Sequence, residues 1–489
     1  MGPEKRPALA KAPTGIAGLD EITGGGLPRG RTTLIVGSPG CGKTLLAMQF
    51  LTYGARELGE PGVCLGFEET AEKLAANLSS LGVDLPSLTR RKKILVDHVW
   101  IDRKEIEETG EYNLDGLFVR LGHAVKTTGA RRVVMDGIET LFAGLSDEAV
   151  LRSELRRLFA WLDDHNLTAI VTGERGDRTF TRHGLEEYIA DCVILLDHRV
   201  TQEISTRRLR IVKYRGSSHG TDEYPFLIDD DGISLVPVTS LALAHRASTR
   251  RVSSGIASLD RMLGGKGFFR GSSVLVSGGA GAGKSSIAAK FANESCSRGE
   301  TCLYFAFEES PSQIIRNMRS VGLGLDQWVR KDVLQFHAVR PTSTGLEAHL
   351  VSMQKLIAAV HPGVVVVDPL TSMFAGGDTH GTRLMFARLI DFLKVRQVTS
   401  LFTDLTLSAM EGGRGLSPHG VSSYMDTWIA LSREDQADGS PGRALTVVKA
   451  RGMAHSRELR ELVVRSHKLD LGNVLAANHR PQESKGRVR

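Results

Sequence analysis

The chain has 489 residues, of which 41% are hydrophobic and 24% are charged. A chain of this length is too long for one hydrophobic core, so we expect at least two domains. The excess of 62 Lys and Arg over 56 Asp and Glu is small, which favours solvated basic ends over a nucleic-acid-binding patch. No apolar run approaches the roughly 18 residues of a membrane-spanning helix, and the first residues lack the apolar stretch of a signal peptide.

The five cysteines are odd in number and show no metal-ligand spacing. This pattern favours reduced thiols over disulfide bonds or a zinc site. We therefore expect a cytoplasmic protein.

Apolar, β-branched runs alternate with helical stretches along the first half of the chain. Helical spacing of apolar residues predicts a helix over 44–59. The runs expected to form strands are continuous rather than alternating, as in buried parallel strands, and lie at residues 32–37, 63–69, 131–137, 167–174 and 192–196. The pattern predicts an α/β fold, with a largely parallel sheet flanked by helices on both faces.

The second half of the chain repeats the first. Residues 14–44 correspond to 254–285, RRVVMDGIETLF corresponds to GVVVVDPLTSMF, and VKYRGSSHG corresponds to VKARGMAHS. A repeat of this length indicates a duplicated domain rather than a solenoid unit. Hydrophobic periodicity gives way to small and basic residues near 236–254, so we place the domains at 13–238 and 250–475.

Each half carries a glycine-rich loop between an apolar strand and a helix, GSPGCGKT at 37–44 and GGAGAGKS at 278–285. Glycines let backbone N–H groups converge on phosphate oxygens. In this motif the lysine, Lys43 or Lys284, reaches the terminal phosphates, and the hydroxyl of Thr44 or Ser285 binds Mg²⁺. The loops predict binding of ATP and Mg²⁺, with the remaining loop contacts made by Ser38, Pro39, Gly40, Cys41, Gly42, Gly279, Ala280, Gly281, Ala282 and Gly283.

Acidic residues follow two further strands of each half. Asp136 and Asp368 end apolar runs, where a carboxylate commonly holds Mg²⁺; the alternative is a cap for the next helix. Glu68–Glu69 and Glu308–Glu309 end the strand after the loop helix. A carboxylate there can deprotonate an attacking water or hydroxyl, although an acidic pair at a helix start is also favoured by the helix dipole alone.

A basic pair recurs near the end of each half, Lys213 with Arg215 and Lys449 with Arg451. Strand alternation places both side chains of a pair on one face. Two cations on one face suit a γ-phosphate held by a neighbouring subunit, as in an arginine finger. The alternative is a charged, solvated strand edge.

With these motifs in place, the sequence resembles the KaiC family, the double-domain RecA-like ATPases of the bacterial circadian clock. The resemblance runs from about Thr14 to Leu471 and includes the glutamate pairs, both K-x-R-G segments and EYPFLIDDDGISLVP. It implies two tandem RecA-like P-loop NTPase domains and a homohexameric double ring with ATP between subunits. The catalytic residues it implies are Glu68, Glu69, Glu308 and Glu309. The metal-binding residues expected are Thr44, Asp136, Ser285, Glu308 and Asp368. The residues implied to reach a neighbour's nucleotide are Lys213, Arg215, Ser217 and His219 in the first ring, and Arg443, Lys449 and Arg451 in the second.

The resemblance also implies serine/threonine autophosphorylation in the second domain. The segment GLSPHGVSSYMDTWIAL places Ser422 and Ser423 at the two acceptor positions, with Ser423 where relatives usually have Thr. Without the resemblance, a Ser-Ser pair in a loop would be read as an ordinary turn. A KaiB-like regulatory partner or a downstream signalling kinase is expected to read the ring.

The chain departs from the clock proteins at three places: Pro369 and Asp404 replace the Ser and Asn found in relatives, and the tail after Leu471 is short and basic. The tail argues against a KaiA-type activator. The motifs are consistent with a signalling role in timing and also with one in stress.

A second function remains open, because RecA-like folds also serve DNA-binding motors of the recombinase and helicase type. Such motors present basic and aromatic residues on channel loops. Residues 174–184 contain Phe180 among basic residues, whereas the matching segment 408–420 is nearly uncharged. We therefore favour an ATPase and autokinase of a signalling ring. Complete glutamate pairs argue against a third possibility, a scaffold that binds ATP only to assemble.

Overall fold

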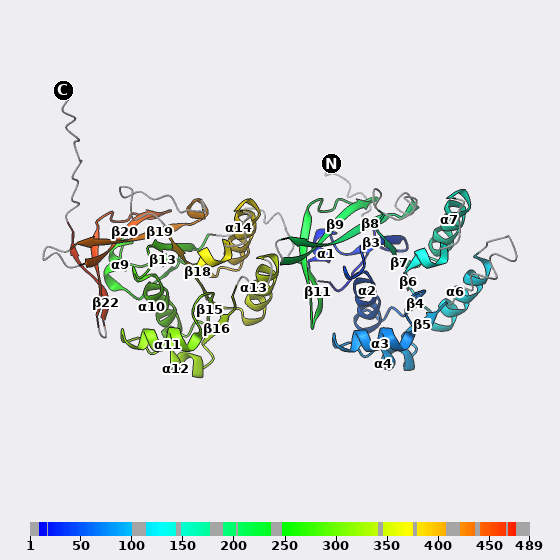
Figure 1. Ribbon diagram of the computed structural model, residues 1–489, viewed down its shortest axis with the longest axis horizontal. Helices are drawn as coiled ribbons and strands as arrows, with labels where there is room; N and C mark the ends of the chain where they lie inside the picture. The colour runs from blue at the N-terminus through cyan, green and yellow to red at the C-terminus, as the bar shows by residue number, and fades with distance from the viewer. Residues whose placement is uncertain are drawn as a thin grey trace, which may run out of the picture. The chain divides into compact units, whose positions relative to one another are not determined.

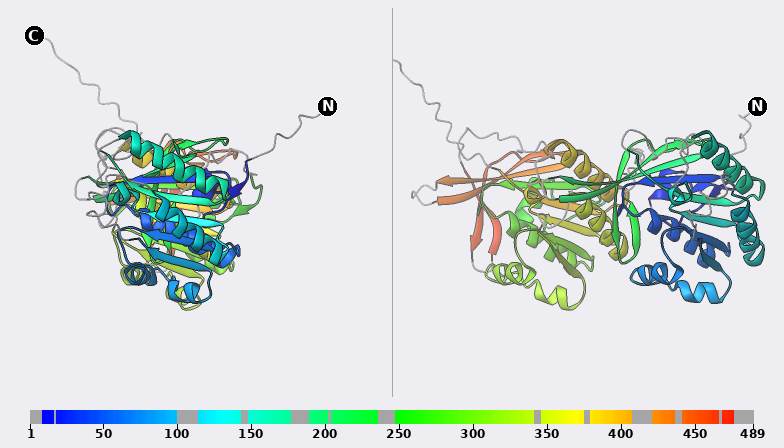
Figure 2. Two further views of the ribbon diagram at one scale, coloured as in Figure 1. Left: turned by 90° about the vertical axis from the view of Figure 1, so that its right-hand side faces the viewer. Right: turned by 45° about the vertical axis from the view of Figure 1, so that its right-hand side comes forward.

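The computed structural model divides the chain into two compact units, Met1–Ser240 and Leu241–Arg489. It describes residues 9–16, 18–99, 114–142, 148–176, 189–201, 204–235, 247–340, 346–374, 379–406, 421–435, 441–465 and 468–475. Each unit is built on a nine-stranded sheet with helices packed along it (Figures 1 and 2). The predicted pair of α/β domains is confirmed.

The sheet of the first unit has the strand order β11-β10-β9-β8-β3-β7-β6-β4-β5. Its strands β8, β3, β7, β6, β4 and β5 run parallel, and β9 to β11 extend it antiparallel. The strands of the unit are β1 (Lys11–Ala12), β2 (Leu27–Pro28), β3 (Thr32–Gly37), β4 (Gly62–Gly66), β5 (Ile94–His98), β6 (Arg132–Asp136), β7 (Thr168–Glu174), β8 (Cys192–Thr201), β9 (Ile204–Tyr214), β10 (Glu223–Asp229) and β11 (Gly232–Leu235). The helices are α1 (Leu19–Ile22), α2 (Lys43–Glu57), α3 (Ala71–Ser79), α4 (Leu85–Arg90), α6 (Asp115–Thr128), η1 (Ile138–Phe142) and α7 (Glu148–Asp164).

The second unit repeats this arrangement, with the order β16-β15-β17-β18-β14-β19-β20-β21-β22. Its strands are β12 (Arg251–Val252), β13 (Phe268–Phe269), β14 (Ser273–Gly278), β15 (Cys302–Ala306), β16 (Leu334–Ala338), β17 (Val364–Asp368), β18 (Thr399–Leu405), β19 (Thr427–Asp435), β20 (Pro441–Ala450), β21 (Arg460–Arg465) and β22 (Lys468–Val474). Its helices are α9 (Ala257–Met262), α10 (Lys284–Ser297), α11 (Pro311–Arg319), α12 (Asp326–Arg330), α13 (Leu346–Val360), η3 (Leu370–Phe374), α14 (Thr379–Val395) and η4 (Val421–Ser423).

The side chains of the continuously apolar strands pack into two hydrophobic cores, one on each face of the sheet. In β3, Ile35 packs into the core under α2, while Leu34 and Val36 pack into the core under α6 and α7. Successive strand residues point to opposite faces, so both faces must be apolar. This is why Leu34, Ile35 and Val36 form an unbroken apolar run in the sequence. Packing on both faces holds β3 in place, and with it the phosphate loop that follows the strand.

The strand expected over 192–196 continues to Thr201 and pairs antiparallel with β9. Beyond Leu196, Asp197 and His198 are polar and half-buried, and Arg199 and the apolar Val200 are exposed. The residues after Leu196 therefore lack the continuous apolar pattern from which the strand over 192–196 was predicted, because the outer part of a sheet need not bury both of its faces.

The start of α11 gives a modest stability prediction. Ser310 caps this helix: its hydroxyl accepts from the Gln313 N–H at 3.3 Å, and the Gln313 side chain accepts from the Ser310 N–H at 2.8 Å. Replacing Ser310 by alanine should lower the free energy of unfolding by about 1 kcal/mol. Chemical denaturation of the full chain tests this, with Val329→Ala, a change of an exposed side chain on α12, as the control. An unchanged denaturation midpoint would contradict it.

Candidate functional site

The first phosphate loop ends β3 and begins α2. Gly40 and Gly42 have φ values of 72° and 104°, a backbone conformation that non-glycine residues rarely adopt. Lys43 is the first residue of α2, and its Nζ donates to the carbonyls of Gly37 at 2.8 Å and Ser38 at 3.3 Å. The loop thus folds around the Lys43 side chain, and the positive end of the α2 dipole lies next to the loop.

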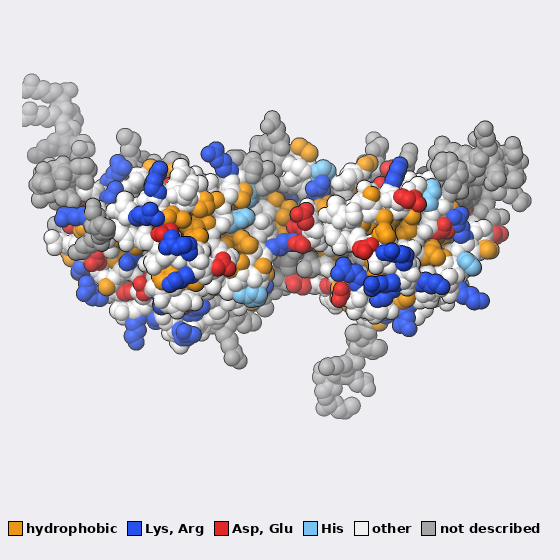
Figure 3. All heavy atoms as spheres, turned by 90° about the horizontal axis from the view of Figure 1, so that it is seen from below, with side chains coloured by type: hydrophobic (Ala, Val, Ile, Leu, Met, Phe, Trp, Pro, Cys, Tyr) orange, Lys and Arg blue, Asp and Glu red, His pale blue; other side chains and the backbone are white. Residues whose placement is uncertain are grey.

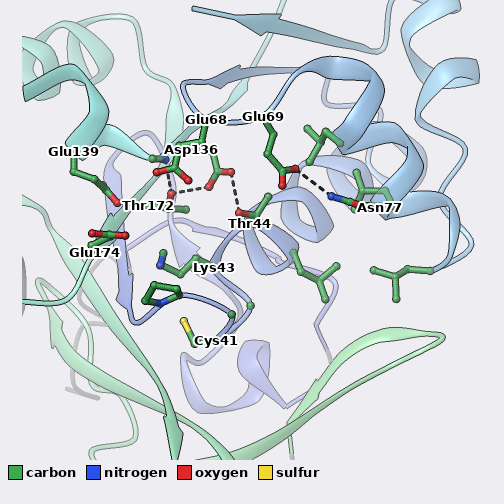
Figure 4. A pocket seen from close by; sticks show the side chains of 18 residues that line it. Cys41, Lys43, Thr44, Glu68, Glu69, Asn77, Asp136, Glu139, Thr172 and Glu174 are labelled. Carbon is green, nitrogen blue, oxygen red and sulfur yellow. Dashed lines mark hydrogen bonds between the residues drawn. The ribbon is translucent and has the colours of Figure 1, made fainter. Parts of the chain in front are cut away.

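A cavity of about 380 Å³ opens over this loop. In it the Thr44 hydroxyl donates to Asp136 Oδ2 at 2.9 Å, and the Thr172 hydroxyl donates to Asp136 Oδ1 at 2.6 Å (Figure 4). The carboxyl ends of β4, β6 and β7 contribute Glu68, Asp136 and Glu174 to its lining. The predicted loop and both predicted carboxylate positions of the first half therefore meet at one edge of the sheet.

The two glutamates of each pair have different partners. Glu69 accepts from Asn77 Nδ2 at 3.2 Å, and Glu309 accepts from Asn317 Nδ2 at 2.9 Å. Glu68 faces Asp136 and Lys43, and burial followed by the Asp136 charge raises the pKa of its carboxyl. A raised pKa suits a proton acceptor at neutral pH. The first glutamate of each pair is thus free of the helix contact that holds the second.

A buried carboxyl that the sequence did not single out lies beside this group. Glu139 in η1 is only 9% exposed, and its Oε2 has no hydrogen-bond partner among the described residues. Its carboxyl points toward that of Glu174 in Figure 4. Burial, followed by the charges of Glu174 and Glu68, raises the pKa of Glu139 to about 7.

The second phosphate loop has the same backbone and a different set of contacts. Gly281 and Gly283 have φ values of 71° and 103°, and Lys284 Nζ donates to the carbonyls of Gly278 at 2.9 Å and Gly279 at 2.8 Å. Burial lowers the pKa of Lys284, opposed by the charges of Asp368, Asp404 and Glu308. Acidic side chains therefore lie close to the lysine of this loop, as they do to the lysine of the first loop.

Asp368 is held differently from Asp136. It accepts from the hydroxyls of Thr403 and of fully buried Tyr304, the latter at 2.6 Å. Among the described residues, the hydroxyl of Ser285 makes no hydrogen bond to Asp368. Glu308 accepts from the Ser372 hydroxyl at 2.8 Å. The two loops are therefore similar in backbone and distinct in the side chains around their acidic residue.

The sequence offered a signal for two residues that the sequence analysis did not single out. Thr172 and Thr403 occupy the same place in the repeated segments AIVTGE and SLFTDL, and each donates to the aspartate of its half. Comparison of the two halves would have identified them. Tyr304 corresponds to Cys64 in the first half, so the repeat gave no indication of its role.

The basic pairs lie at the opposite edge of the sheet from the phosphate loops. Lys213 pairs with Val193 near the start of β8. The phosphate loop follows Gly37, which pairs with Leu196 further along β8. Val193 pairs with Leu34 of β3, which is three residues from Gly37, so the two places are roughly 10 Å apart along the strand at about 3.3 Å per residue. Lys449 pairs with Trp428 in the same way. A chain therefore cannot bring this pair to its own phosphate loop.

A β-bulge lies beside the lysine of each pair. Val193 pairs with Lys213 but Ile194 with Ile211, and Trp428 pairs with Lys449 but Ile429 with Val447. One extra residue, Val212 or Val448, is thus inserted at the same point of both sheets. Such a bulge re-aims the side chains that follow it.

The other expected nucleotide contacts are divided between the two edges. Ser217 accepts from Lys11 Nζ at 2.7 Å, and His219 stacks near Tyr214 at 6.0 Å between ring centres. Arg443 lies instead at the loop edge, where its Nε donates to Gly281 O at 3.1 Å. Arg443 is therefore separated from Lys449 and Arg451.

Ser422 and Ser423 are the last two residues of the 3₁₀ turn η4, and three residues separate this turn from β19. The side chain of Ser422 is half-buried and that of Ser423 is exposed.

Segments 177–188 and 407–420, which contain most of the candidate DNA-binding loop and its counterpart, lie outside the described residues. The side of the first unit that carries α3 and α4 shows Lys and Arg interspersed with Asp and Glu, and so does the side of the second unit that carries α11 and α12 (Figure 3).

The residues present fit a magnesium nucleotide. Mg²⁺ is usually held by one or two protein oxygens together with phosphates and waters, and Thr44 and Asp136 supply two adjacent oxygens beside the loop. Among the described residues no group of three His, Cys, Asp or Glu forms a metal site by itself. The same residues contain no helix with the length and apolar character needed to cross a bilayer.

Fold and site together define a tandem P-loop ATPase of the RecA-like class. The model of the KaiC ATPase family matches residues 12–240 and 252–469, so the chain belongs to the KaiC family. It is 49% identical over 480 residues to the circadian clock protein KaiC2 of Synechocystis sp., covering 97% of this chain and 84% of that protein. It is 36% identical over 459 residues to the circadian clock oscillator protein KaiC of Synechococcus elongatus, covering 94% of this chain and 88% of that protein.

Proposed function

We propose that this chain is a homohexameric, double-ring ATPase and serine autokinase, with domains at 13–238 and 250–475. The first domain would hydrolyse ATP, and the second would transfer the γ-phosphoryl group to Ser422 and Ser423. Each loop set, from Ser38 to Thr44 and from Gly279 to Ser285, would hold the triphosphate. The Mg²⁺ ligands would come from Thr44 and Asp136 in the first domain and from Ser285, Glu308 and Asp368 in the second. Bound Mg²⁺ would neutralise the charge that develops on the phosphates.

One observation carries the proposal: each half has a phosphate loop at one edge of its sheet and a basic pair at the other. Lys213 pairs with Val193 near the start of β8 and Lys449 with Trp428 near the start of β19, whereas the loops follow the opposite strand ends. A basic pair on one subunit can then meet the phosphates held by the next, which is the arginine-finger arrangement. This supports a closed ring of like subunits.

The chemistry of the second domain follows from the placement of Glu308. Its carboxylate would take the proton from a serine hydroxyl as the Ser Oγ–P bond forms. The bond between the γ-phosphorus and the bridging oxygen then breaks, and ADP leaves. Lys284, which faces Glu308 and Asp368, would stabilise the charge on the transferred group. In the first domain Glu68 would activate water in the same way.

A role in timing is proposed from the names of the relatives, circadian clock proteins at 49% and 36% identity, with stress signalling as the alternative. A KaiB-like partner or a downstream kinase would read the phosphorylation state.

Phosphate mapping tests the proposed function. Purified protein incubated with Mg·ATP should form a species of six subunits by native mass spectrometry and carry phosphate at Ser422, Ser423 or both. Ser422→Ala with Ser423→Ala should remove the phosphate and retain the hexamer, since the turn tolerates small residues. An unmodified monomer in the presence of ATP would overturn the proposal. Stimulation of ATP hydrolysis by single-stranded DNA, lost at high salt, would instead favour the motor.

A further inference from the structure

The acceptor turn is held by apolar residues on both sides. Val421 and Met425 are fully buried in the core of the second unit, and they flank the two serines. The Tyr424 N–H donates to Val421 O at 3.0 Å, and the Met425 N–H donates to Ser422 O at 3.4 Å. The turn therefore presents its two serines outward from a fixed base.

The basic pair of the same chain contacts the backbone of this turn. Lys449 Nζ donates to Ser422 O at 2.9 Å, and Arg451 Nη2 donates to Ser423 O at 2.8 Å. The antiparallel register of β19 and β20 brings these groups together, because it pairs Thr427 with Ala450. Each cation thus holds the carbonyl of a different serine.

Asp426 joins the turn to the strand that leads to the phosphate loop. It accepts from the Ser273 N–H at 2.9 Å and the Ser273 hydroxyl at 3.0 Å, and Lys394 Nζ lies 2.9 Å from its Oδ2. The Arg451 N–H donates to Asp426 O at 2.8 Å. The charged groups around the turn are thus Lys394, Asp426, Lys449 and Arg451.

We infer that Lys449 and Arg451 are positioning residues for phosphoryl acceptance, with Lys449 setting the orientation of Ser422 and Arg451 that of Ser423. The inference rests on the proposed autokinase function and deepens it. A residue that only neutralised a neighbour's phosphates would affect both serines alike. A residue bonded to one serine carbonyl affects that serine most, because a charge-assisted hydrogen bond fixes the peptide unit on which the side chain stands.

The geometry also links the acceptor to the neighbouring nucleotide. Lys449 has three N–H donors and Arg451 has five, so each can keep its serine carbonyl while donating to phosphate oxygens. The same side chain would then hold acceptor and donor together, which lowers the entropic barrier to transfer. Burial lowers the pKa of Lys449, and Arg451 lowers it further; an anionic phosphate close by would favour the charged amine.

Site-resolved phosphorylation of single variants tests the inference. Full-length Lys449→Met and Arg451→Met are incubated with saturating Mg·ATP, and phosphate at each serine is quantified by mass spectrometry. Lys449→Met should lower the ratio of phosphate on Ser422 to that on Ser423 by about fivefold, the effect of losing one hydrogen bond. Arg451→Met should shift this ratio by a similar factor in the opposite direction.

Conservative variants and a neighbouring residue provide the controls. Lys449→Arg and Arg451→Lys keep a cationic donor and should restore the wild-type ratio. Val448→Ala changes an exposed side chain next to Lys449 and should leave the ratio unchanged. Equal loss at both serines in Lys449→Met and Arg451→Met would overturn the inference and leave the autokinase function standing. A wild-type protein without phosphoserine would overturn both.

Discussion

Replacing Glu68 by glutamine should lower ATP hydrolysis in the first domain by about a hundredfold, the usual contribution of a general base. Glu68 lies at the end of β4 beside Asp136 and Lys43, and its carboxyl has a raised pKa. Glutamine keeps the size of the side chain and removes the proton acceptor. Phosphate release should be measured in the Glu308→Gln background, so that only the first domain contributes.

Glu69→Gln is the matched control for this prediction. Asn77 Nδ2 already donates to Glu69 Oε2 at 3.2 Å, so an amide at position 69 should leave most of the hydrolysis in place. Glu68→Gln alone should also retain phosphate on the second domain, whereas Glu308→Gln alone should lose it. If Glu69→Gln were inactive while Glu68→Gln hydrolysed ATP normally, the second glutamate would be the base.

Replacing Glu139 by glutamine should remove a pH dependence of stability. The pKa of Glu139 is about 7 in the folded chain, against 4.5 as its ordinary value. Between these two values the folded state holds a proton that the unfolded state has lost, so the stability contributed by the protonated carboxyl falls as pH rises from about 4.5 to 7. The loss is about 3 kcal/mol, at 1.36 kcal/mol per pKa unit.

The Glu139→Gln variant should therefore match the wild type near pH 4.5 and exceed its stability at pH 8. A difference of about 3 kcal/mol corresponds to a rise in Tm of roughly 6–12 °C for a domain of this size. Thermal unfolding of the nucleotide-free chain at both pH values measures it. Glu69→Gln, a carboxylate-to-amide change outside the buried cluster, is the control. Equal Tm differences at the two pH values would contradict the raised pKa.

Much of the fold could be predicted because buried parallel strands have a strong signal. The expected strand over 32–37 has the same bounds as β3, since Leu34, Ile35 and Val36 must be apolar to fill two cores. Of β9 only the end with Lys213 was expected to be a strand, and β10 and β11 were not predicted, because these strands extend the sheet to its edge. There a strand needs to bury only part of its surface, and charged residues such as Arg207 and Arg208 occupy it.

The site was predictable only where its chemistry requires a motif. Phosphate binding fixes the glycines and the lysine, so both loops could be found from the chain alone. Glu139 could not, because its raised pKa comes from burial and then from the charges of Glu174 and Glu68, which are distant in the sequence. The different partners of Asp136 and Asp368 were also hidden, because Tyr304 replaces a cysteine in the middle of an apolar run.

The bulge beside each basic pair restricts how the two halves can diverge. Lys213 lies opposite Val193 and Lys449 opposite Trp428, so losing the single extra residue, Val212 or Val448, would leave each lysine opposite the same partner but would remove the local bend of its strand. Any change of residue type that keeps the strand twisted leaves this geometry intact. A change in length does not. At the bulge the duplicated halves are therefore free to vary in composition, whereas the loss of one residue would alter the bend that aims the basic pair.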